Sequence, residues 1–208
     1  MTDDARKLVG RGYDRMAERF ATWRGEIEGS PELDWVQDLV PLLPEKADVL
    51  ELGCGAAEEP TLVLAEHGRL LGVDISGEQL RRARERCPRG TFVQADMVEL
   101  ELDPESFDAV VALYVFNHVP RADLPPLLEK AALWLRPAGF LLATFGVSGG
   151  EGIEDDWLGV PMFFASYTEA ENRALVRAAG FAIKRDEVVS IAEPEGDARF
   201  QFLLARRT

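Results

Sequence analysis

The sequence predicts an α/β fold: a doubly wound, seven-stranded, mostly parallel sheet that ends in an antiparallel hairpin, with N-terminal lid helices. Short apolar runs alternate with helical patterns along most of the chain, which is the order that builds a parallel sheet covered on both faces. The run at residues 48–52 breaks into glycines before the next helix, as strands do when they lead into a ligand-binding turn. The final runs, at 181–191 and 198–206, are joined by a short turn-rich segment, so we expect them to pair antiparallel.

Length and charge limit the classes of function. The 208 residues suit one domain. A net charge of −14 argues against a nucleic-acid partner. The acidic N-terminus and the lack of a long apolar run predict neither a signal peptide nor a membrane span. We therefore expect a cytoplasmic protein, a monomer or homodimer. Two cysteines and two histidines are too few for a disulfide framework or a structural metal site.

Residues 1–44 are predicted to form a helical cap. Apolar residues recur at near-helical spacing between Asp3 and Trp23, which indicates one or two amphipathic helices. A further helix is expected at 32–43, after Pro31. Tyr13 and Phe20 belong either to a lid over a ligand or to the buried stripe of a capping helix.

Residues 45–147 are predicted to form the ligand-binding core. Its strands are expected at 48–52, 69–73, 91–94, 109–113 and 140–145. Helices are expected between them, beginning near Pro60, after the capping Ser76 and at Arg121. The helix that begins at Arg121 is predicted to end at Leu135, followed by a turn.

The glycine turn after the first strand indicates a nucleoside ligand. Gly53-x-Gly55 is followed about 20 residues later by Asp74, at the end of the next strand, and this spacing suits a carboxylate that binds a ribose. A dinucleotide site would need a third glycine where the chain has Glu58. A carboxylate there would repel a pyrophosphate, so NAD, FAD and a dehydrogenase are disfavoured.

Glu51-x-Gly53-x-Gly55 with Asp74 resembles the first two motifs of the class I S-adenosylmethionine-dependent methyltransferases, which have a Rossmann-like fold. Further stretches resemble the same family, including the leader around Tyr13 and the aspartate after the third strand, which would accept a hydrogen bond from the adenine amine. The resemblance implies S-adenosylmethionine as cofactor and S-adenosylhomocysteine as product. The implied cofactor residues are Tyr13, Glu51, Gly53, Cys54, Gly55, Asp74, Ile75, Gln79, Asp96, Met97 and Leu113. The departure is Ala57, where the family commonly has a glycine, and Glu58-Glu59-Pro60 after it leaves the shape of the loop open.

Chemistry is expected at the turn after the fourth strand, residues 114–120, because ligands of open parallel sheets lie at the strands' carboxyl ends. Tyr114, Asn117 and His118 are the candidate catalytic residues, and Phe116 is a candidate for contact with the acceptor. An imidazole titrates near neutral pH, so His118 is either a general base or a structural residue that holds the turn.

Residues 148–208 are predicted to hold a substrate loop, the last helix and the terminal hairpin. The glycine-rich stretch 146–161 is expected to be a loose loop that serves as a substrate lid. Four aromatic residues there either line an apolar pocket or pack against the core: Trp157, Phe163, Phe164 and Tyr167. Thr168 and Glu171 form a capping-box pattern that starts a helix.

The sequence therefore predicts an S-adenosylmethionine-dependent methyltransferase that acts on an oxygen or nitrogen of a small-molecule acceptor by direct displacement. Such a reaction depends mainly on positioning, so a base is optional. The alternative is a non-catalytic, regulatory S-adenosylmethionine-binding module, with Ala57 and the two glutamates as marks of a degraded site.

Overall fold

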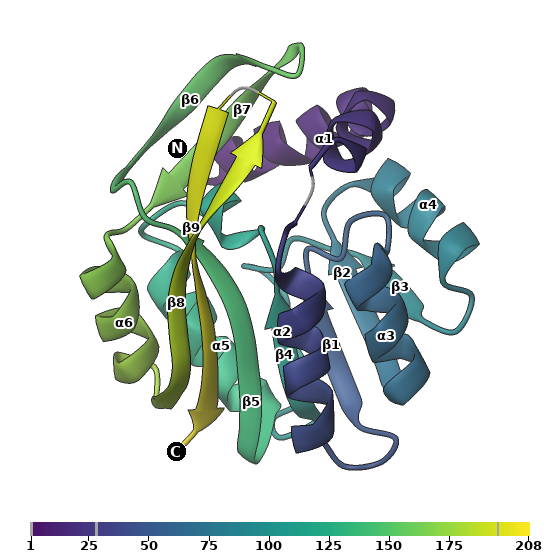
Figure 1. Ribbon diagram of the computed structural model, residues 1–208, viewed down its shortest axis with the longest axis vertical. Helices are drawn as coiled ribbons and strands as arrows, with labels where there is room; N and C mark the ends of the chain where they lie inside the picture. The colour runs from purple at the N-terminus through teal and green to yellow at the C-terminus, as the bar shows by residue number, and fades with distance from the viewer. Residues whose placement is uncertain (1, 28, 195) are drawn as a thin grey trace.

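The computed structural model describes residues 2–27, 29–194 and 196–208, and within them seven strands form the main sheet in the order β3-β2-β1-β4-β5-β9-β8 (Figure 1). Strands β1 to β5 run parallel, whereas β9 pairs antiparallel with both β5 and β8. The main-sheet strands are β1 (Asp48–Leu52), β2 (Arg69–Asp74), β3 (Thr91–Gln94), β4 (Phe107–Ala112), β5 (Leu135–Gly146), β8 (Phe181–Glu193) and β9 (Gly196–Arg207). The predicted fold class is confirmed, including its terminal hairpin.

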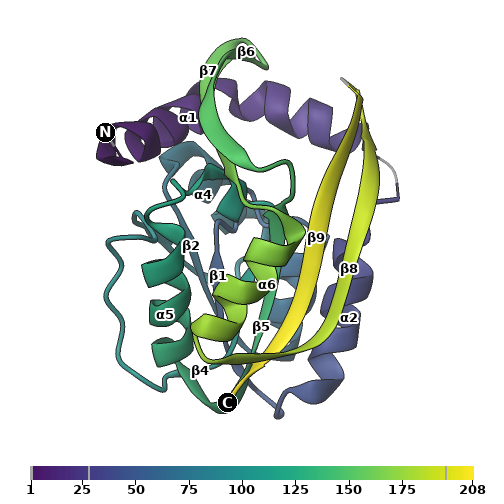
Figure 2. The same cartoon turned by 90° about the vertical axis from the view of Figure 1, so that its left-hand side faces the viewer.

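Helices cover both faces of this sheet, as its apolar central strands require. The buried residues of one face pack against α2, α3 and α4, and those of the other face pack against α5 and α6 (Figures 1 and 2). These helices are α2 (Glu32–Leu39), α3 (Glu59–His67), α4 (Gly77–Arg86), α5 (Leu124–Trp134) and α6 (Glu169–Ala178), with 3-10 turns η1 (Val40–Leu42) and η2 (Phe116–His118). The predicted caps are present: Ser76 accepts from the Gln79 amide, and Thr168 and Glu171 form a capping box.

The N-terminal segment is one continuous helix, α1 (Thr2–Gly25), that crosses the sheet at the ends of its strands (Figure 2). Its apolar face packs on a separate strand pair, through contacts among Val9, Met16, Val160 and Met162. A Cβ on Gly12 would lie 2.6 Å from the Met162 methyl carbon, so the glycine permits this close approach. No helix within the described ranges is both long and apolar enough to cross a membrane.

The prediction of a loose loop at 146–161 is wrong. The chain forms a two-stranded antiparallel sheet there, β6 (Gly150–Trp157) and β7 (Val160–Ser166), that projects beyond the main sheet. Leu158 and Gly159 both have positive φ, 52° and 80°, between the paired Trp157 and Val160. Such a two-residue turn matches the twist of a hairpin. Glycines and acids hid the strand pattern of β6, which is exposed along its length except at Trp157.

The boundary between α5 and β5 also differs from the prediction, because the turn expected after Leu135 belongs to the strand. Leu135 pairs with Phe107, and the register shifts before the next pair. The Arg136 guanidinium fixes this extended segment to neighbouring strands, with nitrogens 2.8 Å from Asp48 Oδ2 and 2.7 Å from Asp108 Oδ2. These ion pairs join three strands at the edge opposite the glycine turn.

Candidate active site

The turn after β1 brings backbone amides close to the neighbouring strand. Gly53 and Gly55 have φ values of 65° and 52°, a region that glycine enters without the steric cost a side chain brings. The Gly53 amide donates to the Val73 carbonyl at 2.7 Å. A Cβ at Gly53 would lie 2.6 Å from Val115 Cβ, so this turn fits tightly against the turn after β4. Ala57 also has a positive φ, 56°, which is the conformation expected of a glycine there.

Asp74 is buried at the end of β2 and closes the turn. Its Oδ2 accepts from the Gly55 amide at 2.9 Å, and its Oδ1 accepts from the Ser76 amide at 2.8 Å. Burial raises the pKa of Asp74 to about 6, and the two amide hydrogen bonds oppose that shift. The carboxylate thus ties the two strand ends together and faces the same cavity as the glycines.

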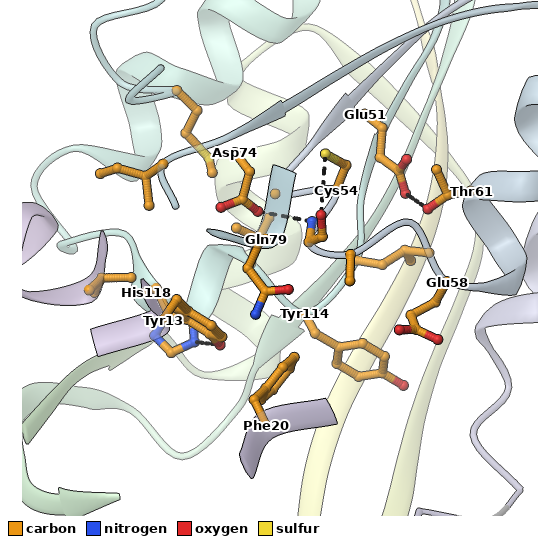
Figure 3. A pocket seen from close by; sticks show the side chains of 18 of the residues that line it. Tyr13, Phe20, Glu51, Cys54, Glu58, Thr61, Asp74, Gln79, Tyr114 and His118 are labelled. Carbon is orange, nitrogen blue, oxygen red and sulfur yellow. Dashed lines mark hydrogen bonds between the residues drawn. The ribbon is translucent and has the colours of Figure 1, made fainter. Parts of the chain in front are cut away.

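Glu51 is buried near the end of β1, two residues before Gly53. Its Oε1 accepts from the Thr61 hydroxyl at 2.9 Å, while its Oε2 has no hydrogen-bond partner among the described residues (Figure 3). Burial raises the pKa of Glu51 to about 8. A buried carboxylate oxygen without a partner is costly unless a ligand donates to it. Gln79 Nε2, in the same cavity, likewise has no partner within the described ranges.

These side chains line a cavity of about 160 Å³. One side is the glycine turn with the ends of β2 and β4, and α1 forms the facing side, where Tyr13 and Phe20 lie across from Cys54 and Asp74 (Figure 3). All eleven residues predicted to contact a cofactor line it: Tyr13, Glu51, Gly53, Cys54, Gly55, Asp74, Ile75, Gln79, Asp96, Met97 and Leu113. Their roles stay predictions, but the fold brings them all to one place, which we call the cofactor cavity.

Polar contacts fasten α1 over this cavity. Arg6 Nε lies 3.2 Å from Asp96 Oδ2, so the aspartate that is predicted to bind adenine also forms an ion pair with α1. Asp14 Oδ1 accepts from the Ser76 hydroxyl at 2.7 Å and from the Glu78 amide at 3.1 Å. Since that amide lies at the N-terminus of α4, the Asp14 carboxylate also interacts favourably with the helix dipole.

Tyr13 and His118 form a hydrogen-bonded pair between α1 and η2. The Tyr13 hydroxyl lies 2.8 Å from His118 Nε2, and His118 Nδ1 lies 2.9 Å from the Phe163 carbonyl oxygen. A carbonyl only accepts, so Nδ1 carries the proton and Nε2 accepts from Tyr13. Burial lowers the pKa of His118 to about 4 and raises that of Tyr13. In this closed arrangement His118 is neutral, and both of its nitrogens are engaged.

Tyr114 has a φ of 53°, unusual for a residue with a side chain. Its amide donates to Thr144 Oγ1 at 2.5 Å, and its hydroxyl lies 2.8 Å from the Ser30 hydroxyl. Burial raises the pKa of Tyr114 to about 12. A non-glycine residue kept in this region is typical of functional turns. The Arg24 guanidinium faces the Tyr114 ring at 5.5 Å.

A second cavity, of about 970 Å³, lies beside the first. Its walls come from α1, the β6–β7 hairpin and the tip of the β8–β9 hairpin. Among the described residues, five line both cavities and form a shared wall: Tyr13, Phe20, Arg24, Tyr114 and His118. A molecule bound in the second cavity would therefore be next to the first cavity at the Tyr13–His118 pair and at Tyr114.

The residues predicted to contact an acceptor divide into two groups. Trp157 and Phe164 line the second cavity, as does Asn117 of the candidate catalytic set. Phe116 is 2% exposed and packs on Phe145 in the core, and Phe163 is buried against α1. Tyr167 lies outside both cavity walls as described, and its hydroxyl donates to the Arg121 carbonyl at 2.7 Å.

Sequence reasoning missed several wall residues because they lie far from the motifs. Phe20 was predicted to belong either to a lid or to a buried stripe, and Trp23 and Arg24, which follow it one turn later on the same helix, were not predicted as wall residues. Glu193 sits at the end of β8, and only the closure of the sheet places it by the cavity. The aromatic spacing on α1 was the single sequence signal available for these positions.

Comparison with known proteins identifies the family. A family model described as a methyltransferase domain matches residues 49–139. The 27-O-demethylrifamycin SV methyltransferase of Amycolatopsis mediterranei is 31% identical over 163 residues, 68% of this chain and 59% of that protein. The chain belongs to the class I S-adenosylmethionine-dependent methyltransferases. It spans about three-fifths of the length of that relative.

Solved methyltransferases have the same fold. An S-adenosylmethionine-dependent methyltransferase from Methanosarcina mazei matches with a TM-score of 0.73 and 16% identity, over 83% of this chain and 96% of that one. The 1,6-didemethyltoxoflavin N1-methyltransferase of Burkholderia thailandensis, solved with its substrate and S-adenosylhomocysteine, has a TM-score of 0.68 and 21% identity, over 96% and 91%. At these sequence identities, the similarity of the structures shows that the fold is shared.

The residues of the cofactor cavity fit the family's cofactor chemically. Glu51 Oε2 is an acceptor without a described partner, and the cofactor's amino acid tail carries an ammonium donor. Gln79 Nε2 is a donor without a described partner, and the ribose and adenine offer acceptors. Asp74 holds a carboxylate beside the glycine turn, where the predicted contact with the ribose hydroxyls would be made.

Proposed function

We propose that this chain transfers a methyl group from S-adenosylmethionine to an oxygen or nitrogen of a small-molecule acceptor by direct displacement. One observation carries the proposal: a cofactor cavity and a larger second cavity meet at a single wall made by Tyr13, Phe20, Arg24, Tyr114 and His118. A methyl donor on one side and a nucleophile on the other can be aligned there. We call the larger cavity the acceptor cavity.

The cofactor, when bound, supplies an electrophilic methyl group on a sulfonium. Glu51 would take the ammonium of its tail, Asp74 the ribose hydroxyls, and Asp96 the adenine amine. The chain's own contribution is mainly positional, because in-line displacement needs the nucleophile at about 3–3.5 Å from the methyl carbon. Closure of α1 would exclude water from the cofactor side.

His118 serves in this proposal as a positioning residue. Its Nε2 accepts from Tyr13 and its Nδ1 donates to the Phe163 carbonyl, so the imidazole links the lid to the hairpin. Its low pKa makes it a weak base at neutral pH. The acceptor therefore loses its proton to water or to another group of the acceptor cavity.

Calorimetry with S-adenosylmethionine and S-adenosylhomocysteine tests the cofactor half of the proposal. We expect micromolar binding to the purified protein and loss of that binding in Asp74→Ala. Asp34→Ala, which removes an exposed carboxylate on α2, is the matched control and should bind normally. A folded wild-type protein that binds neither ligand would refute the proposal. Cofactor binding without turnover across an acceptor screen would favour the non-catalytic module.

A further inference from the structure

The acceptor cavity carries more negative than positive groups. Among its described wall residues the carboxylates come from two hairpins, Glu151 and Glu154 from β6, and Glu193 and Asp197 from the tip of β8–β9. Carboxylates that line one cavity add their potentials, and the low-dielectric walls concentrate the combined potential. The cavity thus favours a cation over an anion.

The positive groups of this wall are already engaged. Arg24 forms an ion pair with Glu32, and Arg199 Nη2 lies 3.1 Å from Glu169 Oε1. His118 is neutral, with its pKa lowered by burial to about 4. A carboxylate or phosphate on the acceptor would therefore find no described cation on this wall that lacks an anionic partner.

Among the carboxylates of the acceptor cavity, Glu193 is the one whose charge contributes to the pKa of both Tyr13 and Tyr114. Burial is the main cause of the raised pKa of Tyr13 and of Tyr114. The charge of Asp74 comes next for Tyr13, Ser30 and Arg24 oppose the shift at Tyr114, and the charge of Glu193 adds a smaller part to both pKa values. The side chain is half-buried at the end of β8. Partial burial makes its charge less screened than that of the exposed Glu154 and Asp197. A cation bound to Glu193 would lie in the cavity that Tyr13 and Tyr114 of the shared wall also line.

Aromatic rings form another part of the acceptor cavity's wall. The Trp157 ring centroid lies 6.1 Å from that of Phe20, 5.6 Å from that of Trp23 and 5.3 Å from that of Phe164. The rings meet at varied angles, so the cluster offers both faces and edges. Such a wall binds a flat apolar body, and aromatic faces also attract a cation within about 6 Å.

We propose that the acceptor is an amine carried on a planar apolar body, and that Glu193 binds its nitrogen beside Tyr13 and Tyr114. This inference rests on the proposed function and narrows it to nitrogen. The apolar body would lie on Trp157 and its aromatic neighbours. Glu193 would act as a specificity-determining residue that selects amines over alcohols and acids of the same shape.

The transfer step balances as follows in this arrangement. The bound ammonium first gives one proton to water through the cavity mouth, while Glu193 keeps a hydrogen bond from a remaining N–H. The nitrogen lone pair then forms a bond to the methyl carbon as the carbon–sulfur bond breaks, and that bonding pair stays on sulfur. The products are an N-methylammonium, the neutral thioether and the released proton.

Binding of three isosteric probes to protein saturated with S-adenosylhomocysteine tests the inference. Naphthylethylamine is a cation at pH 7, naphthylethanol is neutral and naphthylacetate is an anion. Calorimetry should show the amine binding about tenfold more tightly than the alcohol, which is 1.4 kcal/mol, and the acid binding most weakly. Glu193→Gln should bring the ratio of the amine and alcohol affinities close to one. Glu187→Gln, on the same strand but exposed and paired with Arg185, should leave that ratio unchanged.

Equal binding of amine and alcohol, preferential binding of the acid, or no detectable amine binding at millimolar concentration would overturn the inference. So would an unchanged ratio in Glu193→Gln. S-adenosylhomocysteine is titrated first against the wild type and both variants. If the wild type fails to bind it, the cofactor assignment fails, and the same probe ranking measured on the empty protein still decides the acceptor class.

Discussion

The cofactor cavity and the acceptor cavity share five described residues, yet they are built from different kinds of structure. The first is formed largely at the ends of parallel strands, where sheet hydrogen bonds fix each backbone position. The second is formed by a helix, a separate hairpin and the overhanging tips of β8 and β9. The contrast suggests that cofactor chemistry is set by the sheet, whereas acceptor chemistry is set by additions that can vary independently of it.

The largest expected effect is a loss of stability on the cofactor side, where a substitution in the glycine turn would disrupt the fixed backbone geometry. In Gly53→Ala the new Cβ would lie 2.6 Å from Val115 Cβ. Rotation of the Val115 side chain cannot relieve this contact, because the backbone fixes the position of Cβ. The alanine would also have to keep a φ near 65°. We expect the free energy of unfolding to fall by about 3–4 kcal/mol, from left-handed backbone strain and overpacking together. Urea unfolding of the empty protein measures this change.

Gly55→Ala is the matched control for this variant. Its φ is also positive, 52°, but no described atom lies within 4 Å of the added Cβ. Gly55→Ala should therefore lower the free energy of unfolding only through left-handed backbone strain, by about 1–2 kcal/mol. If both variants lost the same stability, the close contact between the glycine turn and the turn after β4 would contribute nothing.

An intermediate effect is expected on the acceptor side. Trp157→Ala removes the central ring of the aromatic cluster. Trp157 is not a described wall residue of the cofactor cavity, although its ring contacts Tyr13, Phe20 and His118 of the shared wall. With S-adenosylhomocysteine bound, the affinity for naphthylethylamine should fall about tenfold, or 1.4 kcal/mol, while S-adenosylhomocysteine affinity stays within about twofold. Parallel losses of both affinities would mean that the two cavities are not independent.

The smallest effect concerns protons rather than affinity. An ammonium placed against Glu51 would lower its pKa from about 8. Cofactor binding at pH 7 should therefore release close to one proton in the wild type. Calorimetry in buffers of different ionisation enthalpy counts it. In Glu51→Gln this release should disappear, and a persisting release would place the ammonium elsewhere.

The same carboxyl also affects stability in the empty protein. Because its pKa is raised on folding, from 4.5 to about 8, the native state binds the proton more tightly than the unfolded state. Stability from this group is therefore greatest below pH 4.5 and is lost as pH rises through 8. Glu51→Gln should flatten that part of the stability profile.

Local sequence was sufficient for the cofactor side. Gly53, Gly55 and Asp74 lie at the ends of consecutive strands, and parallel strands place their carboxyl ends together. The motif spacing therefore implied their position in space. The helix caps at Ser76 and Thr168 could be predicted equally well, because each depends on two residues three positions apart in the sequence.

The acceptor side depends on contacts between distant segments, which a local pattern does not encode. Glu193 reaches the cavity because β9 pairs with β5, and that pairing puts the β8–β9 tip beside α1. The β6–β7 hairpin was taken for a loop because its acids and glycines have low strand propensity. Phe116 resembled a wall residue but turned inward to Phe145, since the 3-10 turn at η2 directs successive side chains to different sides.

The exposed edge of β6 has a consequence for how the protein behaves at high concentration. An edge strand with free backbone groups is a template for another chain. The residues of β6 include Glu151, Glu154, Asp155 and Asp156, all exposed. Two copies that approached along this edge would bring like charges together. The acids that hid the strand pattern in the sequence thus also protect the strand against edge-to-edge association, and substituting them with neutral residues would remove that protection.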